Sequence, residues 1–99
     1  MAEKSYHRIA AVQKACAILA VLAESKVPIT GAEVAIRVDL PPGTVMCQLA
    51  TLEDAGFVQE IGGGWRPGLV LALYWARRKA DLHTERDRID GELEKLGVN

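Results

Sequence analysis

No lysine or arginine occurs between Arg37 and Arg66, although the 99-residue chain carries 12 such residues. That interval instead holds acidic residues, namely Asp39, Glu53, Asp54 and Glu60. The formal net charge is -1, so the chain has no overall positive field that would attract a polyanion. Contact with nucleic acid would therefore depend on a local patch of the surface.

The sequence also lacks the residue sets that catalysis and metal binding need. It has no Gly-rich phosphate loop, no Ser-His-acid set and no His, Cys and carboxylate cluster at metal-ligand spacing. Cys16 and Cys47 form no C-x-x-C motif, which predicts two reduced thiols, with a disulfide or a redox pair as open alternatives. We therefore expect no catalytic residues, no cofactor and no metal site.

Long hydrophobic runs are missing as well. The run at residues 15–23 is too short to span a membrane. It follows Lys4 and Arg8 and could mimic a signal peptide, but Gln13 and Lys14 precede it directly and its apolar spacing is helical. A chain of this length supports one small core and leaves no room for a ligand-sensing domain. We expect a cytoplasmic protein without a membrane partner or a small-molecule effector domain.

The first third of the chain contains signals for two helices. Apolar residues at steps of three and four predict a helix over residues 9–25. Its inward stripe is expected to consist of Ile9, Val12, Cys16, Leu19 and Ala23. Residues 27–29 are extended because of Pro28, and they could supply a short strand. Thr30 and Glu33 then form a capping box that opens a short helix ending near Val38, with Ile29 and Val34 as its hydrophobic staple.

The middle of the chain predicts a third helix followed by a β-ribbon. This helix starts at or near Pro41, ends at about Ala55 and is stopped by Gly56. Its inward residues are Val45, Leu49 and Leu52. Residues 57–61 alternate as a half-buried strand, the glycines at 62–64 form a turn, and the returning strand begins at Trp65. Trp65 is interpreted as a core residue beneath the ribbon.

The last part of the chain predicts one long helix, from Leu69 almost to the end. Its apolar residues recur at steps of three, four and seven along one edge: Leu71, Trp75, Leu82, Ile89, Leu93 and Leu96. A long helix with one apolar edge needs a partner, so this stripe predicts a homodimer. Parallel and antiparallel pairing both remain open, and a fold-back of the first half of the helix is a further alternative. The expected organisation is a flexible stretch (1–8), a winged helix-turn-helix (9–68) and a dimerisation helix (69–99).

Residues 12–73 resemble the DNA-binding domain of the isocitrate-lyase-regulator (IclR) family of bacterial transcription factors. The resemblance is carried by a recognition helix starting Leu-Pro, a Thr-Val step, a Leu-Ala-Thr-Leu segment, a Gly-Phe-Val strand and an aromatic-Arg-x-Gly wing end. In this chain these elements are Leu40-Pro41, Thr44-Val45, Leu49-Ala50-Thr51-Leu52, Gly56-Phe57-Val58 and Trp65-Arg66-Pro67-Gly68. The resemblance implies a mainly α fold with a small β-wing, and a double-stranded DNA partner.

The chain departs from the family pattern in its recognition helix. Pro42 and Gly43 stand where a basic residue usually precedes the Thr, and Met46 and Cys47 stand where a His-Arg pair usually follows the Val. On a helix over about residues 41–55, the outward face and its surroundings still offer candidate DNA contacts. Together with the wing at residues 57–67, these candidates are Thr30, Gly43, Thr44, Cys47, Gln48, Thr51, Gly63 and Arg66.

The sequence therefore predicts a small bacterial or phage DNA-binding regulator. In this interpretation two recognition helices, spaced by the dimer, enter successive major grooves while the wings touch the flanking backbone. The alternative is a protein-interaction module, in which a winged helix without a basic reading surface docks on another protein. The missing positive charge between Arg37 and Arg66 is the feature that separates the two hypotheses.

Overall fold

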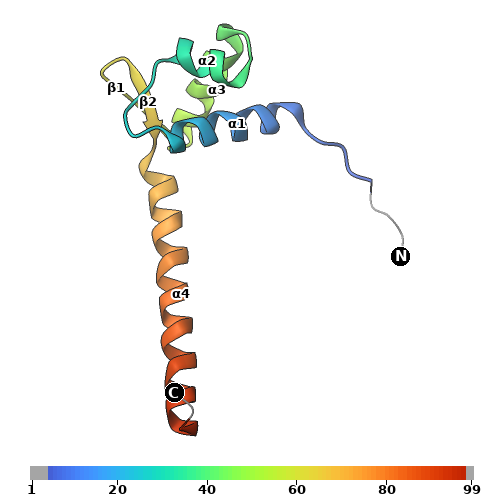
Figure 1. The fold of residues 1–99 in the computed structure, drawn as a ribbon. Coiled ribbons are helices and arrows are strands. Elements are labelled where there is room, and N and C mark those ends of the chain that lie inside the picture. The colour runs from blue at the N-terminus through green and yellow to red at the C-terminus, as the bar shows by residue number, and fades with distance from the viewer. Residues whose placement is uncertain (1–4, 98–99) are drawn as a thin grey trace.

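A computed structural model of the chain describes residues 5–97, and it confirms a mainly helical fold with a small β-wing. Three helices and a hairpin form a head, and a long final helix projects from it (Figure 1). The elements within the described range are α1 (Ala10–Glu24), α2 (Gly31–Val38), α3 (Pro42–Asp54), β1 (Val58–Ile61), β2 (Gly64–Pro67) and α4 (Leu69–Leu96). The predicted flexible stretch falls partly on residues 1–4, which lie outside the described residues.

The core of the head is built from α1, α2, α3 and the two strands. Its buried side chains are Ile18, Leu22, Ile29, Val34, Ala35, Val45, Leu49, Leu52, Val58 and Trp65. The three inward residues predicted for the third helix are all among them, as are both residues of the predicted staple. Burying this apolar surface is what fixes the angle between α2 and α3.

The predicted inward stripe of α1 is wrong. The helix instead buries Ile18 and Leu22, while Ile9, Val12 and Cys16 are exposed. Because α1 is apolar on most of its faces, its sequence allows more than one stripe at helical spacing. Packing against α2, α3 and β2 selects the face that becomes buried.

Local capping sets the bounds of α2. The Thr30 side chain accepts a hydrogen bond from the Glu33 backbone N–H at 3.1 Å, as the capping box predicts. The Glu33 carboxylate does not complete the box, because it lies 3.5 Å from the Arg37 guanidinium. The helix ends at Asp39, which adopts a left-handed conformation with φ 56°.

α3 begins one residue later than predicted, since Pro41 is its N-cap and Pro42 its first residue. Its C-terminus is closed by two backbone hydrogen bonds, from Gly56 N–H to the Glu53 carbonyl and from Phe57 N–H to the Leu52 carbonyl, both 2.9 Å. This is a Schellman ending, and Gly56 supplies its left-handed residue with φ 79°. A side chain there would lie 2.6 Å from Val70 Cγ2, so this glycine also lets α4 start close to α3.

The wing is a two-stranded antiparallel ribbon, β1 paired with β2. A third extended segment joins it, because Ile29 and Trp65 exchange backbone hydrogen bonds of 3.1 and 2.7 Å. Trp65 is only 5% exposed, which confirms its predicted place in the core. The predicted alternation of β1 fails at its outer end, where Ile61 is exposed because nothing in the described part of the chain covers the tip of the wing.

α4 has no buried residue and leaves the head as a separate rod (Figure 1). It meets the head through its first turns, where Tyr74 packs edge-to-face on Phe57 with ring centroids 6.2 Å apart. The fold-back alternative for this helix is therefore wrong. The radius of gyration is 19.3 Å, whereas a compact domain of this length has about 13 Å. The excess comes from a helix that extends away from the core.

Candidate nucleic-acid interface

The core packing of α3 determines which of its side chains reach the surface. With Val45, Leu49 and Leu52 buried on one side, Thr44 and Gln48 are half-buried at the edge of the opposite face. The remaining predicted contacts of this helix are exposed: Gly43, Cys47 and Thr51. The structure therefore brings five of the predicted positions together on one helix.

The charges of the interval from Arg37 to Arg66 are not spread evenly over this surface. The first half of α3, residues 42–48, carries no charged side chain, while Glu53 and Asp54 lie in the last turn of the helix. At 1.5 Å per residue, Glu53 lies about 14 Å along the axis from Thr44. The first half of α3 itself, where free backbone N–H groups favour an anion, is thus uncharged, and the acidic residue near it is Asp39, two residues before the N-cap Pro41.

The hydroxyl groups of the predicted contacts differ in what they already bind. Thr51 donates its hydroxyl to the Cys47 backbone carbonyl at 2.8 Å, so it is engaged by its own helix. Thr30 is engaged as the cap of α2. Thr44, near the start of α3, is the hydroxyl best placed at the neutral end of this helix.

Met46 and Cys47 are both exposed, as is required of a surface that contacts another molecule. A side chain added at Gly31 would lie 2.6 Å from the Met46 sulfur, so Met46 leans over the first turn of α2. Cys16 and Cys47 are free thiols.

The wing presents Arg66 next to a neutral partner. Its guanidinium donates from Nε to the Gln59 side-chain oxygen at 2.8 Å, and the two residues face each other in the strand register. An amide does not cancel the positive charge, and the bond fixes the direction of a long side chain. The turn that connects β1 and β2 contains Gly62 and Gly63. Both have positive φ, and each has open space where a side chain would be. The tip of the wing therefore carries backbone that a second molecule can approach closely.

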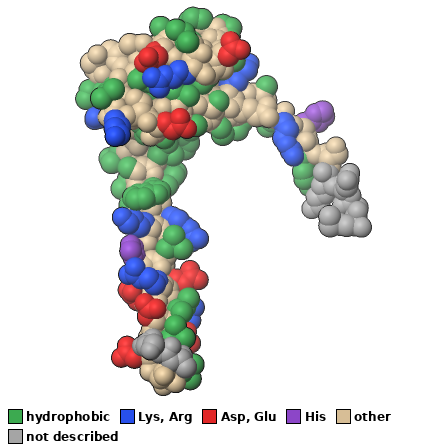
Figure 2. All heavy atoms as spheres, viewed as in Figure 1, with side chains coloured by type: hydrophobic (Ala, Val, Ile, Leu, Met, Phe, Trp, Pro, Cys, Tyr) green, Lys and Arg blue, Asp and Glu red, His purple; other side chains and the backbone are tan. Residues whose placement is uncertain are grey.

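The other basic residues are less available for contact with DNA, or they lie outside α3 and the wing. Arg37 faces Glu33 within its own helix, at 3.5 Å. Lys14 is half-buried on α1, and Lys4 lies outside the described residues. Along α4, positive and negative side chains are mixed (Figure 2). Arg88 and Glu92, one turn apart on α4, form an ion pair at 2.7 Å.

Arg86 pairs with a residue next to it in sequence. Its guanidinium lies 3.5 Å from the carboxylate of Asp87. Sequence analysis missed the position of Lys79, whose ammonium lies 4.9 Å from the centre of the Trp75 ring. The spacing of four residues between an aromatic and a lysine was the available signal.

The stripe predicted for dimerisation is on the surface of this single chain. Leu71 is half-buried near the head, and the rest of the stripe is exposed: Trp75, Leu82, Ile89, Leu93 and Leu96. Exposed apolar side chains at helical spacing over this length are costly in water unless another surface covers them.

One surface feature was missed altogether. An open, mainly apolar hollow lies between α2 and the start of α3, lined by Ala32, Ala35, Ile36, Asp39, Leu40 and Pro42. Ile36 is 79% exposed. Ile36 directly follows Val34 and Ala35, the buried residues of α2. An apolar residue just outside that buried face was the signal that could have identified the hollow.

The described residues 5–97 contain no group of three or more His, Cys, Asp and Glu side chains placed to hold a metal ion. In the same range, no helix is both long and apolar enough to cross a membrane.

Comparison with known proteins agrees with this arrangement of elements. The family model of the IclR helix-turn-helix domain matches residues 11–62, which is more than half of the chain and runs from α1 through the tip of the wing. Among curated proteins, no match is found. The chain therefore belongs to the IclR helix-turn-helix family, whose domain is a DNA-binding domain of transcription regulators.

Proposed function

We propose that the chain binds double-stranded DNA as a homodimer, with the start of α3 in the major groove and the wing on the flanking backbone. The observation that carries this proposal is the combination of an uncharged first half of α3, residues 42–48, with an arginine on the wing whose hydrogen-bond partner is neutral. Backbone N–H groups and the Thr44 hydroxyl suit phosphates, and Gln48 suits a base edge. Arg66 supplies positive charge for a phosphate or for the minor groove.

The mechanism proposed is steric and needs few ionic contacts. With Arg66 as the basic residue of each reading surface, a dimer neutralises few phosphates, so its affinity has a shallow dependence on salt. The α4 stripe provides the second copy, because it is exposed in the single chain and is long enough to hold two heads together. A dimer of such heads occupies DNA and excludes other proteins from it.

The test compares Thr44→Ala with Thr84→Ala in fluorescence-anisotropy titrations of duplex DNA. Both changes remove one threonine hydroxyl from a helix, but Thr84 lies in the middle of α4, far from the head. We expect Thr44→Ala to weaken binding about fivefold or more, the scale of one lost hydrogen bond, and Thr84→Ala to leave it unchanged. Equal affinities for the two variants and the unmodified chain would refute the assignment of α3 as the reading helix.

A second candidate function is docking on another protein, and one observation favours it. The hollow between α2 and α3 is apolar, and Ile36 beside it is largely exposed. Ile36→Ser separates the two candidates, because Ile36 is not among the proposed DNA contacts. Unchanged DNA binding by this variant supports the DNA-binding proposal. Absence of DNA binding by the unmodified chain favours protein docking instead.

A further inference from the structure

The apolar stripe of α4 follows a heptad repeat, in which every seventh residue returns to the same edge of the helix. Trp75, Leu82, Ile89 and Leu96 are each separated by seven residues and take the d positions. The corresponding a positions, three residues before each d, are Ala72, Lys79, Arg86 and Leu93. Two of these four are basic, and their placement distinguishes the two ways in which two copies of α4 can pair.

Parallel pairing would place like charges together. It sets Lys79 opposite Lys79 and Arg86 opposite Arg86 inside the seam, because equal positions face each other. On the flank it sets Glu85, a g residue, opposite Asp90 of the second copy, an e residue. Each of these contacts is repulsive, and those in the seam are also partly desolvated.

Antiparallel pairing removes the repulsion from the seam. The two helices can be aligned so that Thr84 of one copy lies level with Thr84 of the other. In this register, Lys79 faces Ile89 and Arg86 faces Leu82 of the second copy. The Lys79 ammonium already lies over the Trp75 ring of its own chain, so its aliphatic stem is available for packing.

On the flank of the same register, Arg78 faces Glu92 of the second copy, and symmetry forms this pair twice. Glu85 meets Glu85 once at the centre, beside Arg86 of both copies. The antiparallel arrangement therefore has two attractive pairs and one compensated like-charge contact.

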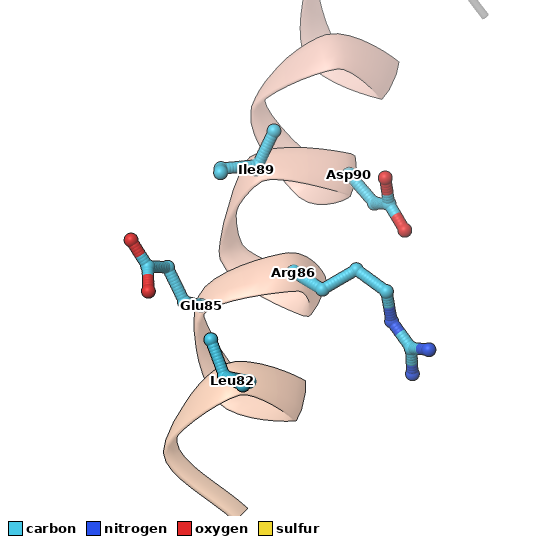
Figure 3. Close-up of a pocket in the computed structure, with 5 residues that line it drawn as sticks. All are labelled: Leu82, Glu85, Arg86, Ile89 and Asp90. Carbon is cyan, nitrogen blue, oxygen red and sulfur yellow. The ribbon is translucent and has the colours of Figure 1, made fainter. Parts of the chain in front are cut away.

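A hollow on α4 marks a place where a side chain of the second copy can insert. It is lined by Leu82, Glu85, Arg86, Ile89 and Asp90, and its surface is mostly apolar. Figure 3 shows Leu82 and Ile89 along the helix, with Glu85 on one side and Arg86 and Asp90 on the other. Successive d residues with the g and a residues between them form the hole that receives a knob in a coiled coil. An antiparallel partner inserts its Leu82 there, whereas a parallel partner would insert its Arg86 beside the Arg86 of the first chain.

We propose that α4 pairs antiparallel with α4 of a second copy, with Leu82 of each chain in this hollow of the other. The proposal rests on the homodimer of the proposed function and specifies the relative direction of its two α4 helices. From Thr84 to the start of α4 is 15 residues, so the two heads are attached about 45 Å apart at opposite ends of the rod. That exceeds the 34–36 Å, roughly, between successive major grooves on one face of DNA. The attachment points are therefore set wider apart than one helical turn of DNA, and the spacing of the half-sites also depends on how far each head extends beyond its end of the rod.

Disulfide exchange between single-cysteine chains tests the orientation. In a Cys16→Ser, Cys47→Ser background, a chain with Arg78→Cys is mixed with a differently tagged chain carrying Glu92→Cys in glutathione buffer. Random pairing of the two chains would make half of the linked dimers mixed. We expect a larger fraction, because positions 78 and 92 face each other and the second Arg78–Glu92 pair of the mixed dimer stays intact. A chain carrying only Leu93→Cys should not link to itself, since its two copies lie about 27 Å apart along an antiparallel rod.

Each outcome of this experiment is decisive. A self-linked Leu93→Cys chain without the mixed disulfide overturns the antiparallel orientation and leaves the dimer standing. If neither disulfide forms and sedimentation shows a monomer, both the dimer and its geometry are refuted, while DNA binding by a single head remains separately testable by anisotropy. Circular dichroism of every variant verifies that α4 is still helical.

Discussion

Replacing Leu82 with alanine should weaken the dimer, and Leu73 provides a matched control. Both are leucines on α4, and both are 48% exposed in the single chain. Leu82 lies on the d edge of the stripe, whereas Leu73 lies on nearly the opposite face of the helix, at a b position. Because leucine and alanine are both good helix formers, neither change should unfold α4.

The magnitude follows from the surface that remains to be covered. Complete burial of a leucine side chain contributes about 1.5–3 kcal/mol. Since about half of Leu82 is still exposed, dimer formation gains roughly half of that amount in each chain, and the dimer contains the residue twice. Leu82→Ala should therefore cost roughly 1.5–3 kcal/mol per dimer, which raises the dissociation constant about 10- to 100-fold.

Sedimentation equilibrium over a dilution series measures the dissociation constants of both variants. Leu82→Ala should shift the monomer–dimer midpoint to higher concentration, while Leu73→Ala should remain within about twofold of the unmodified chain. Equal shifts for the two variants would mean that the stripe is not the seam. The second copy would then not contact this edge of α4.

Further expectations concern the head and the DNA. Gly56→Ala should destabilise the fold by about 1–3 kcal/mol in urea unfolding, because the residue has φ 79° and the added methyl would meet Val70; a change below about 0.5 kcal/mol would contradict this. Arg66→Ala should lower the slope of log affinity against log salt by about one per head, whereas Arg88→Ala at the far end of α4 should not change it.

Local signals were sufficient for most of the secondary structure. Thr30 caps α2 as its spacing to Glu33 predicts, and Gly56 stops α3 in the left-handed conformation. Trp65 is in the core, where a large aromatic at the foot of a short ribbon belongs. The cap of α2 and the stop of α3 depend on residues within a few positions of one another, whereas Trp65 follows from its residue type, because its partner Ile29 is distant in sequence.

The inward face of α1 could not be predicted in the same way. Several stripes of apolar residues fit helical spacing on this helix, and which one is buried depends on partners that are distant in sequence. Ile18 and Leu22 are buried because α2, α3 and β2 meet that face. The exposed hollow beside Ile36 was missed for a similar reason, since it exists only where α2 and α3 come together.

The charge of the candidate interface also required the fold. Counted along the chain, the interval from Arg37 to Arg66 is acidic. In space, Glu53 and Asp54 fall at the far end of α3, so its N-terminal half carries no charge of its own, and Asp39 is the acidic residue that stays near it. The bond that orients Arg66 through Gln59 depends on strand register and could not be deduced from either residue alone.

The central claim is that this winged helix still binds DNA despite its sparse positive charge. A fluorescence-anisotropy titration of the unmodified chain with mixed-sequence duplex DNA, at two salt concentrations, tests it most directly. We expect a dimer to bind the DNA at about 50 mM salt. Its affinity should fall only modestly at about 150 mM salt, because the dimer neutralises few phosphates. No binding at about 50 mM salt, where non-specific contacts are strong, would contradict the account.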